Sequence, residues 1–207
     1  MIKRLFDLIA GIFILILSSP FLLLISILNA LFYDGNIFFT QERIGINGKT
    51  FKLYKFKSMN DKKDEDGILL DDTQRVTSFG AFLRDYSLDE IPSVINLILG
   101  DISLVGPRPL PEKYRNRFSK EQFKRHNVKP GITGLAQVKG RNTISWRKKF
   151  QYDLFYVQKN NFLFDLIILI NTFKVVVQKK GINHNDKETM PEFYGSMKKE
   201  EIKNEKK

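Results

Sequence analysis

The stretch RDYSLDEIPSVINLILGDISLVGPRPLP, residues 84–111, holds the features around which the chain is organised. An adjacent acid pair, Asp89 and Glu90, precedes a short apolar run, and the stretch closes on a Pro-Arg-Pro turn. Proline is tolerated in the first turn of a helix but breaks its interior, so Pro92 predicts a helix over 90–98 that begins just before it. The acid pair is then expected at a helix N-terminus, where free N–H groups and the helix dipole favour carboxylates and phosphates.

Two interpretations of this acid pair are open from the local sequence. Ser87, followed three residues later by Glu90, matches a capping box, in which the acids serve only the helix end. Alternatively, Arg84 and Arg108 flank the pair. Carboxylates together with guanidinium groups suit an anionic, metal-bound substrate.

The composition limits the classes of function. The 207 residues, 43% of them hydrophobic, suffice for one domain plus an appendage. The chain has no cysteine, which excludes disulfides, thiolate zinc sites and cysteine nucleophiles and suits a reducing compartment. The net charge of +11 favours anionic partners, which are nucleic acid, anionic lipid or phosphorylated small molecules.

The N-terminal segment is long and apolar. No charged residue occurs over 8–33, a run longer than the roughly 20 apolar residues that span a bilayer. One interpretation is a plain transmembrane helix. Lys3 and Arg4 would then hold the N-terminus in the cytoplasm and place the remaining, strongly basic chain outside, against the usual distribution of positive charge.

The other interpretation is a re-entrant helix that enters and leaves the membrane by one face. Ser19 and Pro20 lie near the middle of the apolar run. A proline there removes a backbone hydrogen bond and bends the helix, and serine hydroxyls can bond the carbonyls that are freed. Both ends of the segment would then be cytoplasmic.

A β-hairpin is predicted after the apolar segment. Residues 36–42 and 50–57 have strand-like composition, and the Asn-Gly pair at 47–48 is a strong turn signal. Lys55 and Lys57 lie two positions apart, so both are expected on one face of the second strand. They form either a solvated face or a pair of phosphate contacts.

The rest of the chain contains further predicted helices. Residues 162–180 are apolar but interrupted by Asp165 and Lys174, so they form a core helix or, as we favour, an amphipathic helix in the membrane interface. The acidic loop over 60–74 lacks the spacing of a calcium loop, and neither histidine belongs to a metal motif. The other predicted helices are residues 76–86, 112–126 and 146–156.

Several short motifs follow one another along the chain. They are Lys3-Arg4 with Asp7, Ser19-Pro20, QERIG (41–45), YKFKSM (54–59), LDEIP (88–92), SLVGPRP (103–109), PGITGLAQ (130–137) and GRN (140–142). Through these motifs, nearly the whole chain resembles the bacterial sugar transferase family, the monotopic phosphoglycosyl transferases. Residues 144–150 and 193–195 are similar to the branch that starts bacterial protein N-glycosylation with a diacetylbacillosamine phosphate. Ser93 departs from the family, which usually has glutamine there.

The resemblance implies a two-step phosphoglycosyl transfer. Asp89 corresponds to the nucleophile that attacks a UDP-sugar and keeps the phosphosugar while UMP leaves. Polyprenyl phosphate, normally undecaprenyl phosphate, then takes up the phosphosugar. Glu90 corresponds to the partner acid associated with the required Mg²⁺. The expected substrate-binding residues are Lys55, Lys57, Arg84, Pro107, Arg108, Pro109 and Arg141.

The implied fold is α/β, mostly α, and membrane-associated. A re-entrant helix (helix–break–helix) is expected over 1–34, with Lys3, Arg4, Ser19 and Pro20 setting its topology. A small catalytic domain with a short β-hairpin and amphipathic helices follows over 35–182, and then a polar, poorly ordered tail over 183–207. The catalytic domain is expected on the cytoplasmic face of the inner membrane, in contact with anionic lipid and not with nucleic acid.

Two alternatives accompany this prediction. The expected donor carries N,N'-diacetylbacillosamine or another N-acetylated sugar, and the same reaction with galactose or glucose phosphate is the first alternative. The second is a basic, membrane-anchored binding protein without catalysis, which the net charge of +11 permits. That alternative leaves the acid pair and the Pro-Arg-Pro turn unexplained.

Overall fold

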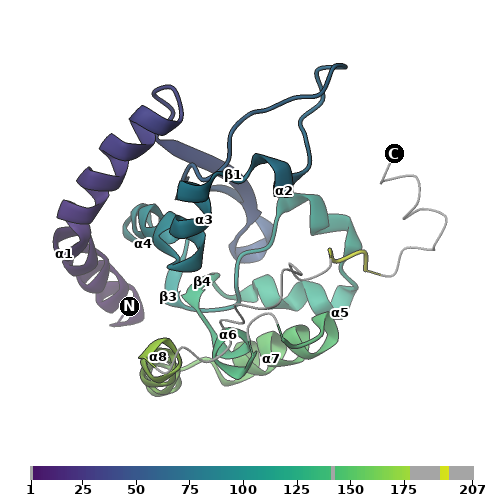
Figure 1. Cartoon of the computed structure of the whole chain (residues 1–207). Coiled ribbons are helices and arrows are strands. Elements are labelled where there is room, and N and C mark those ends of the chain that lie inside the picture. Colours follow the sequence, from purple (N-terminus) through teal and green to yellow (C-terminus); the bar gives the residue numbers. More distant parts are fainter. Residues whose placement is uncertain (1, 141–142, 178–191, 196–207) are drawn as a thin grey trace. The chain divides into compact units, whose positions relative to one another are not determined.

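The computed structural model describes residues 2–140, 143–177 and 192–195 (Figure 1). The predicted tail over 183–207 lies outside the described residues except for 192–195, and Arg141 lies outside them as well. The chain divides into two compact units. The N-terminal unit comprises Phe6–Gln41 and Lys52–Leu99, and the C-terminal unit comprises Met1–Leu5, Glu42–Phe51 and Gly100–Lys207.

The apolar N-terminal segment is one long helix, α1 (Ile2–Phe32), with Pro20 inside it. It is long and apolar enough to cross a membrane. The sequence predicts a helix–break–helix, whereas the structure has one continuous helix, whose ribbon changes direction near its middle (Figure 1). Pro20 lacks the N–H that would bond the Ile16 carbonyl. The Ser19 hydroxyl donates to that carbonyl at 2.8 Å, so the carbonyl is satisfied despite the proline.

The predicted hairpin is present. Strands β1 (Phe38–Ile44) and β2 (Thr50–Phe56) pair in a two-stranded sheet, and the short 3-10 turn η1 (Ile46–Gly48) lies between them. Asn47 and Gly48 both adopt positive φ, 54° and 75°, which is the conformation that an Asn-Gly turn favours.

The hairpin is followed by four helical segments of the N-terminal unit. They are α2 (Asp72–Arg75), α3 (Ser78–Asp85), the 3-10 helix η2 (Leu88–Ser93) and α4 (Val94–Leu99). Ile25 of α1, Phe56 of β2 and Leu83 of α3 form a buried apolar cluster. The second half of α1 is therefore part of the core of this unit and packs with the strand and the helix that flank the acid pair.

The single helix predicted over 90–98 is wrong in detail. It is a 3-10 turn followed by α4. Pro92 has no N–H with which to extend α4 backward, and 3-10 turns are frequent at helix starts. Gly100, with φ of 90°, ends α4 as expected of a C-terminal glycine.

The C-terminal unit contains a small parallel sheet that the sequence did not reveal. Strand β3 (Ser103–Val105) pairs with β4 (Gly131–Thr133). The helix predicted over 112–126 is also wrong, because the Ser119 hydroxyl caps a new short helix and so divides the segment. After β3, the helical segments of this unit are η3 (Glu112–Arg117), α5 (Lys120–Phe123), η4 (Lys124–Asn127), α6 (Leu135–Gly140), α7 (Trp146–Lys159) and α8 (Phe162–Val177).

Two groups of contacts stabilise the C-terminal unit. An aromatic cluster joins Tyr114, Phe150 and Phe193 with the buried Leu110, so residues 192–195 pack on this unit. Asp165, the acid inside the apolar α8, is buried. Its carboxylate forms an ion pair with Lys3 and accepts the Tyr156 hydroxyl at 2.6 Å. The pairing of Lys3 and Tyr156 with this carboxylate accounts for an acid in an otherwise apolar helix.

Candidate active site

The acid pair lies beside one lysine in the N-terminal unit. The Lys55 ammonium of β2 is 2.7 Å from Glu90 Oε1 and 3.5 Å from Asp89 Oδ2. The Asp89 side chain is 11% exposed, whereas the Glu90 side chain is 31% exposed. Two adjacent carboxylates therefore share one cation, and the more deeply buried of the two is Asp89.

Burial raises the pKa of Asp89 above its ordinary value of 3.8. The Lys55 ammonium opposes that rise in pKa, the Glu90 carboxylate adds to it, and the Arg84 guanidinium opposes it. A buried carboxylate is poorly solvated, and a neighbouring cation favours its charged form. This combination suits an oxygen nucleophile that must be ionised yet has little water around it.

The acid pair does not form the capping box that the sequence permits. Ser87 adopts the left-handed conformation with φ of 56° and its side chain makes no cap hydrogen bond. The Glu90 N–H bonds the Ser87 backbone carbonyl at 3.3 Å instead. Reciprocal capping therefore does not explain the two acids.

Asn96 of α4 positions the acid pair against β2. Its side-chain carbonyl accepts the Tyr54 N–H at 3.0 Å and its amide donates to the Lys52 carbonyl at 2.8 Å. Asn96 is fully buried. The side chain thus bonds the free edge of β2 as a neighbouring strand would. A polar residue inside an apolar helix is the one local sign of this role in the sequence.

Arg84 of α3 lies near the acid pair because the backbone of α3 closely approaches the backbone at Ser58. Its Nε donates to the Ser58 hydroxyl at 2.9 Å. A Cβ on Gly80 would lie 1.8 Å from the Ser58 carbonyl, so α3 can approach this segment only with glycine there. Lys57, by contrast, forms an ion pair with Asp61, and the structure does not bring it to Asp89.

The Pro-Arg-Pro turn lies in the C-terminal unit, and its backbone carbonyls all accept hydrogen bonds. The Pro107 carbonyl accepts the Gly131 N–H at 3.0 Å and the Pro109 carbonyl accepts Arg43 Nη1 at 3.0 Å. The Arg108 carbonyl accepts Arg125 Nη2 at 2.8 Å. Arg108 itself is exposed between buried neighbours, so a rigid turn presents its guanidinium outward.

A buried ion pair supports this turn. Arg125 Nε and Nη2 donate to Asp153 Oδ2 at 3.0 and 2.8 Å, and both side chains are almost fully buried. Lys149, on the same helix as Asp153, has its pKa lowered to about 8, first by burial and then by the positive charge of Arg108. Neither Arg125 nor Lys149 was identified from the sequence, because charged residues on a basic helix usually lie in solvent.

The donor chemistry of the acid pair fits magnesium. Mg²⁺ takes oxygen ligands and is usually held by one or two carboxylates together with substrate phosphates. Asp89 and Glu90 supply two such carboxylates, one of them partly exposed. Within the described residues there is no cluster of three or more acids or histidines that would form a metal site by itself.

The residues predicted to set the membrane topology of α1 have partners nearby in the structure. Lys3 pairs with Asp165, and the Arg4 guanidinium packs against Gly100. Ser19 bonds the carbonyl beside Pro20, as described above. These contacts give Lys3, Arg4 and Ser19 structural roles whatever the topology of α1.

Comparison with known proteins places the chain in a family. It is 46% identical over 195 residues to the uncharacterized sugar transferase EpsL of Bacillus subtilis, covering 94% of this chain and 96% of that protein. It is 36% identical to the exopolysaccharide production protein ExoY of Rhizobium meliloti, covering 87% and 88%. It is 39% identical to the UDP-glucose:undecaprenyl-phosphate glucose-1-phosphate transferase of Klebsiella pneumoniae, covering 86% of this chain and 41% of that protein. A family model for bacterial sugar transferases matches residues 1–179, and the chain therefore belongs to the bacterial sugar transferase family.

Proposed function

We propose that this transferase moves a sugar 1-phosphate from a UDP-sugar to a polyprenyl phosphate and releases UMP. The observation that carries the proposal is the buried Asp89 carboxylate beside the Lys55 ammonium, 3.5 Å away, in a chain of this family. Relatives are named for glucose-1-phosphate and galactose phosphate transfer to undecaprenyl phosphate, which supports the same class of donor and acceptor here.

In the first step, an oxygen of the Asp89 carboxylate attacks the phosphorus that carries the sugar. The bond from that phosphorus to the bridging oxygen breaks, and UMP leaves with the bridging oxygen. An aspartyl phosphate that carries the sugar is formed. Aspartyl phosphates are an established form of covalent catalysis. Burial of Asp89 favours this step because a carboxylate with few waters is a stronger nucleophile.

In the second step, a phosphate oxygen of the polyprenyl phosphate attacks the same phosphorus. The bond between phosphorus and the Asp89 carboxylate oxygen breaks. The products are polyprenyl diphosphate sugar and the regenerated carboxylate. Phosphoryl transfer of this kind depends mainly on positioning and on neutralising charge, which is the role we assign to Lys55, Arg84, Arg108 and Arg141. Lys57, paired with Asp61, is a weaker candidate for the same role.

Glu90, with Asp89, would hold a magnesium ion together with the substrate phosphates. When bound, the ion would neutralise negative charge on the diphosphate. The Lys55 ammonium would meanwhile offset part of the negative charge of both carboxylates, since it lies within 3.5 Å of each.

We also propose that α1 is re-entrant and that Asp89 faces the cytoplasm. UDP-sugars are cytosolic, and Lys3 and Arg4 favour the cytoplasmic side. The bend of α1 (Figure 1) supports this topology, as does the packing of its second half against β2 and α3.

The donor sugar has two groups of candidates. N,N'-diacetylbacillosamine or another N-acetylated sugar is the expectation from the sequence pattern. Glucose and galactose are supported by the names of relatives. A panel of UDP-sugars in a UMP-release assay distinguishes these donors.

The nucleophile is tested with full-length protein in detergent. Incubation with UDP-sugar alone should add the mass of one phosphosugar to the wild type and to Asp85→Asn, an exposed control at the end of α3. Asp89→Asn should gain no mass and release no UMP. A covalent adduct on Asp89→Asn would contradict the assignment, and a protein that binds UDP-sugar but never releases UMP would be a binding protein.

A further inference from the structure

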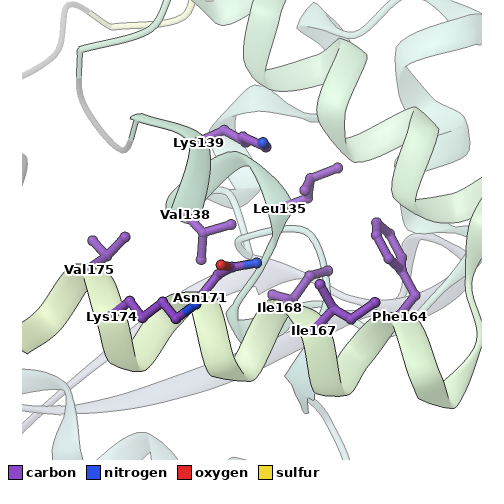
Figure 2. Close-up of a pocket in the computed structure, with 9 residues that line it drawn as sticks. All are labelled: Leu135, Val138, Lys139, Phe164, Ile167, Ile168, Asn171, Lys174 and Val175. Carbon is purple, nitrogen blue, oxygen red and sulfur yellow. The ribbon is translucent and has the colours of Figure 1, made fainter.

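A groove in the C-terminal unit lies between α6 and α8 (Figure 2). Its volume is about 390 Å³, within the size range of small-molecule sites. Its lining is mostly apolar and includes Leu135 and Val138 of α6 and Ile168 of α8. An apolar surface of this size in the C-terminal unit indicates a ligand that is at least partly hydrocarbon.

Two lysines line the groove, one from each of the two helices that form it. Lys139 extends from α6 and Lys174 from α8 (Figure 2), and both are exposed. No acidic side chain is among the residues that line the groove. Neither ammonium is ion-paired with a carboxylate of the described residues. Two positive charges over an apolar floor are complementary to an anionic amphiphile.

The outer face of α8 indicates where such an amphiphile would come from. Leu163, Ile167, Ile170 and Phe173 recur at helical spacing and are 53–71% exposed. The acid of this helix, Asp165, is buried against Lys3 and Tyr156 and so leaves this face apolar. Ile167 also lines the groove, so the apolar face and the groove are continuous. A helix with such a face and lysine at its margin is typical of the membrane interface.

We propose that the groove binds an anionic glycerophospholipid of the bilayer, with Lys139 and Lys174 on either side of its phosphate and the glycerol and first acyl carbons on the apolar floor. The charged residues that line the groove are two lysines, and none of its lining residues is an arginine. Lysine ammonium groups act as point charges toward phosphate. The exposed apolar face of α8, which is continuous with the groove, favours a phosphate that carries acyl chains. The site would dock the C-terminal unit on the membrane and is distinct from the sugar transfer proposed above.

The test is lipid binding by full-length protein in detergent. Native mass spectrometry would follow titration with phosphatidylglycerol and, separately, with phosphatidylcholine. A lysine near a bilayer contributes a factor of about five in affinity for anionic lipid, so the pair contributes about 25-fold. The variant Lys139→Gln/Lys174→Gln should bind phosphatidylglycerol about 25-fold more weakly than the wild type, with its binding of phosphatidylcholine unchanged. Lys139→Arg/Lys174→Arg, which keeps both charges, should retain most of the wild-type affinity for phosphatidylglycerol.

A matched control separates the groove from general charge. Lys120→Gln/Lys159→Gln removes the same charge from exposed positions outside the groove and should bind phosphatidylglycerol as the wild type does. Equal losses in both double variants would overturn the proposal, as would wild-type protein without preference for phosphatidylglycerol. Tighter binding of polyprenyl phosphate, with displacement of phosphatidylglycerol that depends on Lys139 and Lys174, would assign the groove to the acceptor and would also overturn it.

Discussion

The side-chain carbonyl of Asn96 accepts the backbone N–H of Tyr54 at 3.0 Å. A residue of α4 thus bonds β2 at the edge where another strand would otherwise pair. Because η2 leads directly into α4, this bond also fixes the acid pair. Lys55 follows Tyr54 in β2, and its ammonium therefore meets Glu90 at 2.7 Å. The geometry of the candidate nucleophile depends on a side chain that need not touch the substrate.

Replacing Asn96 should separate the acid pair from Lys55. Asn96→Leu leaves the part-buried Tyr54 N–H and Lys52 carbonyl without this partner, and each lost hydrogen bond costs about 0.5–1.5 kcal/mol. We expect a lower unfolding temperature and a large fall in kcat. The exposed Asn127→Ala is the control and should change neither. Wild-type kcat in Asn96→Leu would show that the acid pair is positioned by other contacts.

The sequence predicted the hairpin, α3, α7 and the place of the acid pair because each has a local signal. Asn47-Gly48 dictates a turn, and Thr77 caps α3 by accepting the Gly80 N–H. The β3–β4 pair was missed because Gly131–Thr133 is too short for alternation and its partner is distant in sequence. Asn96, Arg125 and the groove at Lys139 and Lys174 depend on tertiary contacts, which no local pattern records.

The pH dependence of the reaction should reflect the raised pKa of Asp89. Burial keeps this carboxyl protonated to a pH above its ordinary pKa of 3.8, and the proposed nucleophile is the carboxylate. Activity should therefore fall as pH decreases through the raised pKa. Lys55→Gln removes a positive charge that lowers the pKa of Asp89. In this variant the loss of activity at low pH should therefore begin at a higher pH than in the wild type. The measurement is log kcat/KM against pH, and an unmoved or lowered acid limb in Lys55→Gln would refute the assignment.

Arg125 should affect catalysis through the Arg108 turn. Its guanidinium bonds both Asp153 and the Arg108 carbonyl. Arg125→Lys keeps a positive charge beside Asp153 but loses the planar fork. If Arg108 holds substrate phosphate, we expect kcat/KM to fall about tenfold, the equivalent of about 1.4 kcal/mol. Arg117→Lys, another buried arginine of this unit, is the control. Reduced thermal stability with unchanged kcat/KM would limit Arg125 to a structural role.

His126 should make the fold sensitive to acid. It is buried, and burial together with the neighbouring Arg125 charge lowers its pKa to about 3. Between pH 6.5 and 3 the unfolded chain binds a proton there that the native state does not, so stability falls as pH falls. From pH 6.5 to 4.5 this loss of stability amounts to about 2 kcal/mol. His126→Gln should lose less stability over that interval, as measured by denaturant unfolding followed through Trp146, the single tryptophan. Equal losses in the variant and the wild type would contradict the prediction.

The topology of α1 can be tested by labelling, because the chain has no native cysteine. Ile2→Cys and Lys120→Cys place single thiols at exposed positions near the start of α1 and on α5. If α1 re-enters, an impermeant maleimide should label neither site in intact cells and both after lysis. Labelling of either site from outside would mean that α1 spans the membrane.

Pro20 and Ser19 should control this topology together. Pro20→Ala restores the N–H that can bond the Ile16 carbonyl, so the helix should straighten and expose one of the two thiols to the outside. Ser19→Ala removes the hydroxyl that bonds this carbonyl at 2.8 Å but keeps the proline. In lipid the freed carbonyl has no water to bond, so this variant should stay re-entrant and become less stable. If Pro20→Ala leaves both thiols protected, the bend does not depend on the proline, and the packing of Ile25 against Phe56 and Leu83 would be the contact that holds α1 on one side.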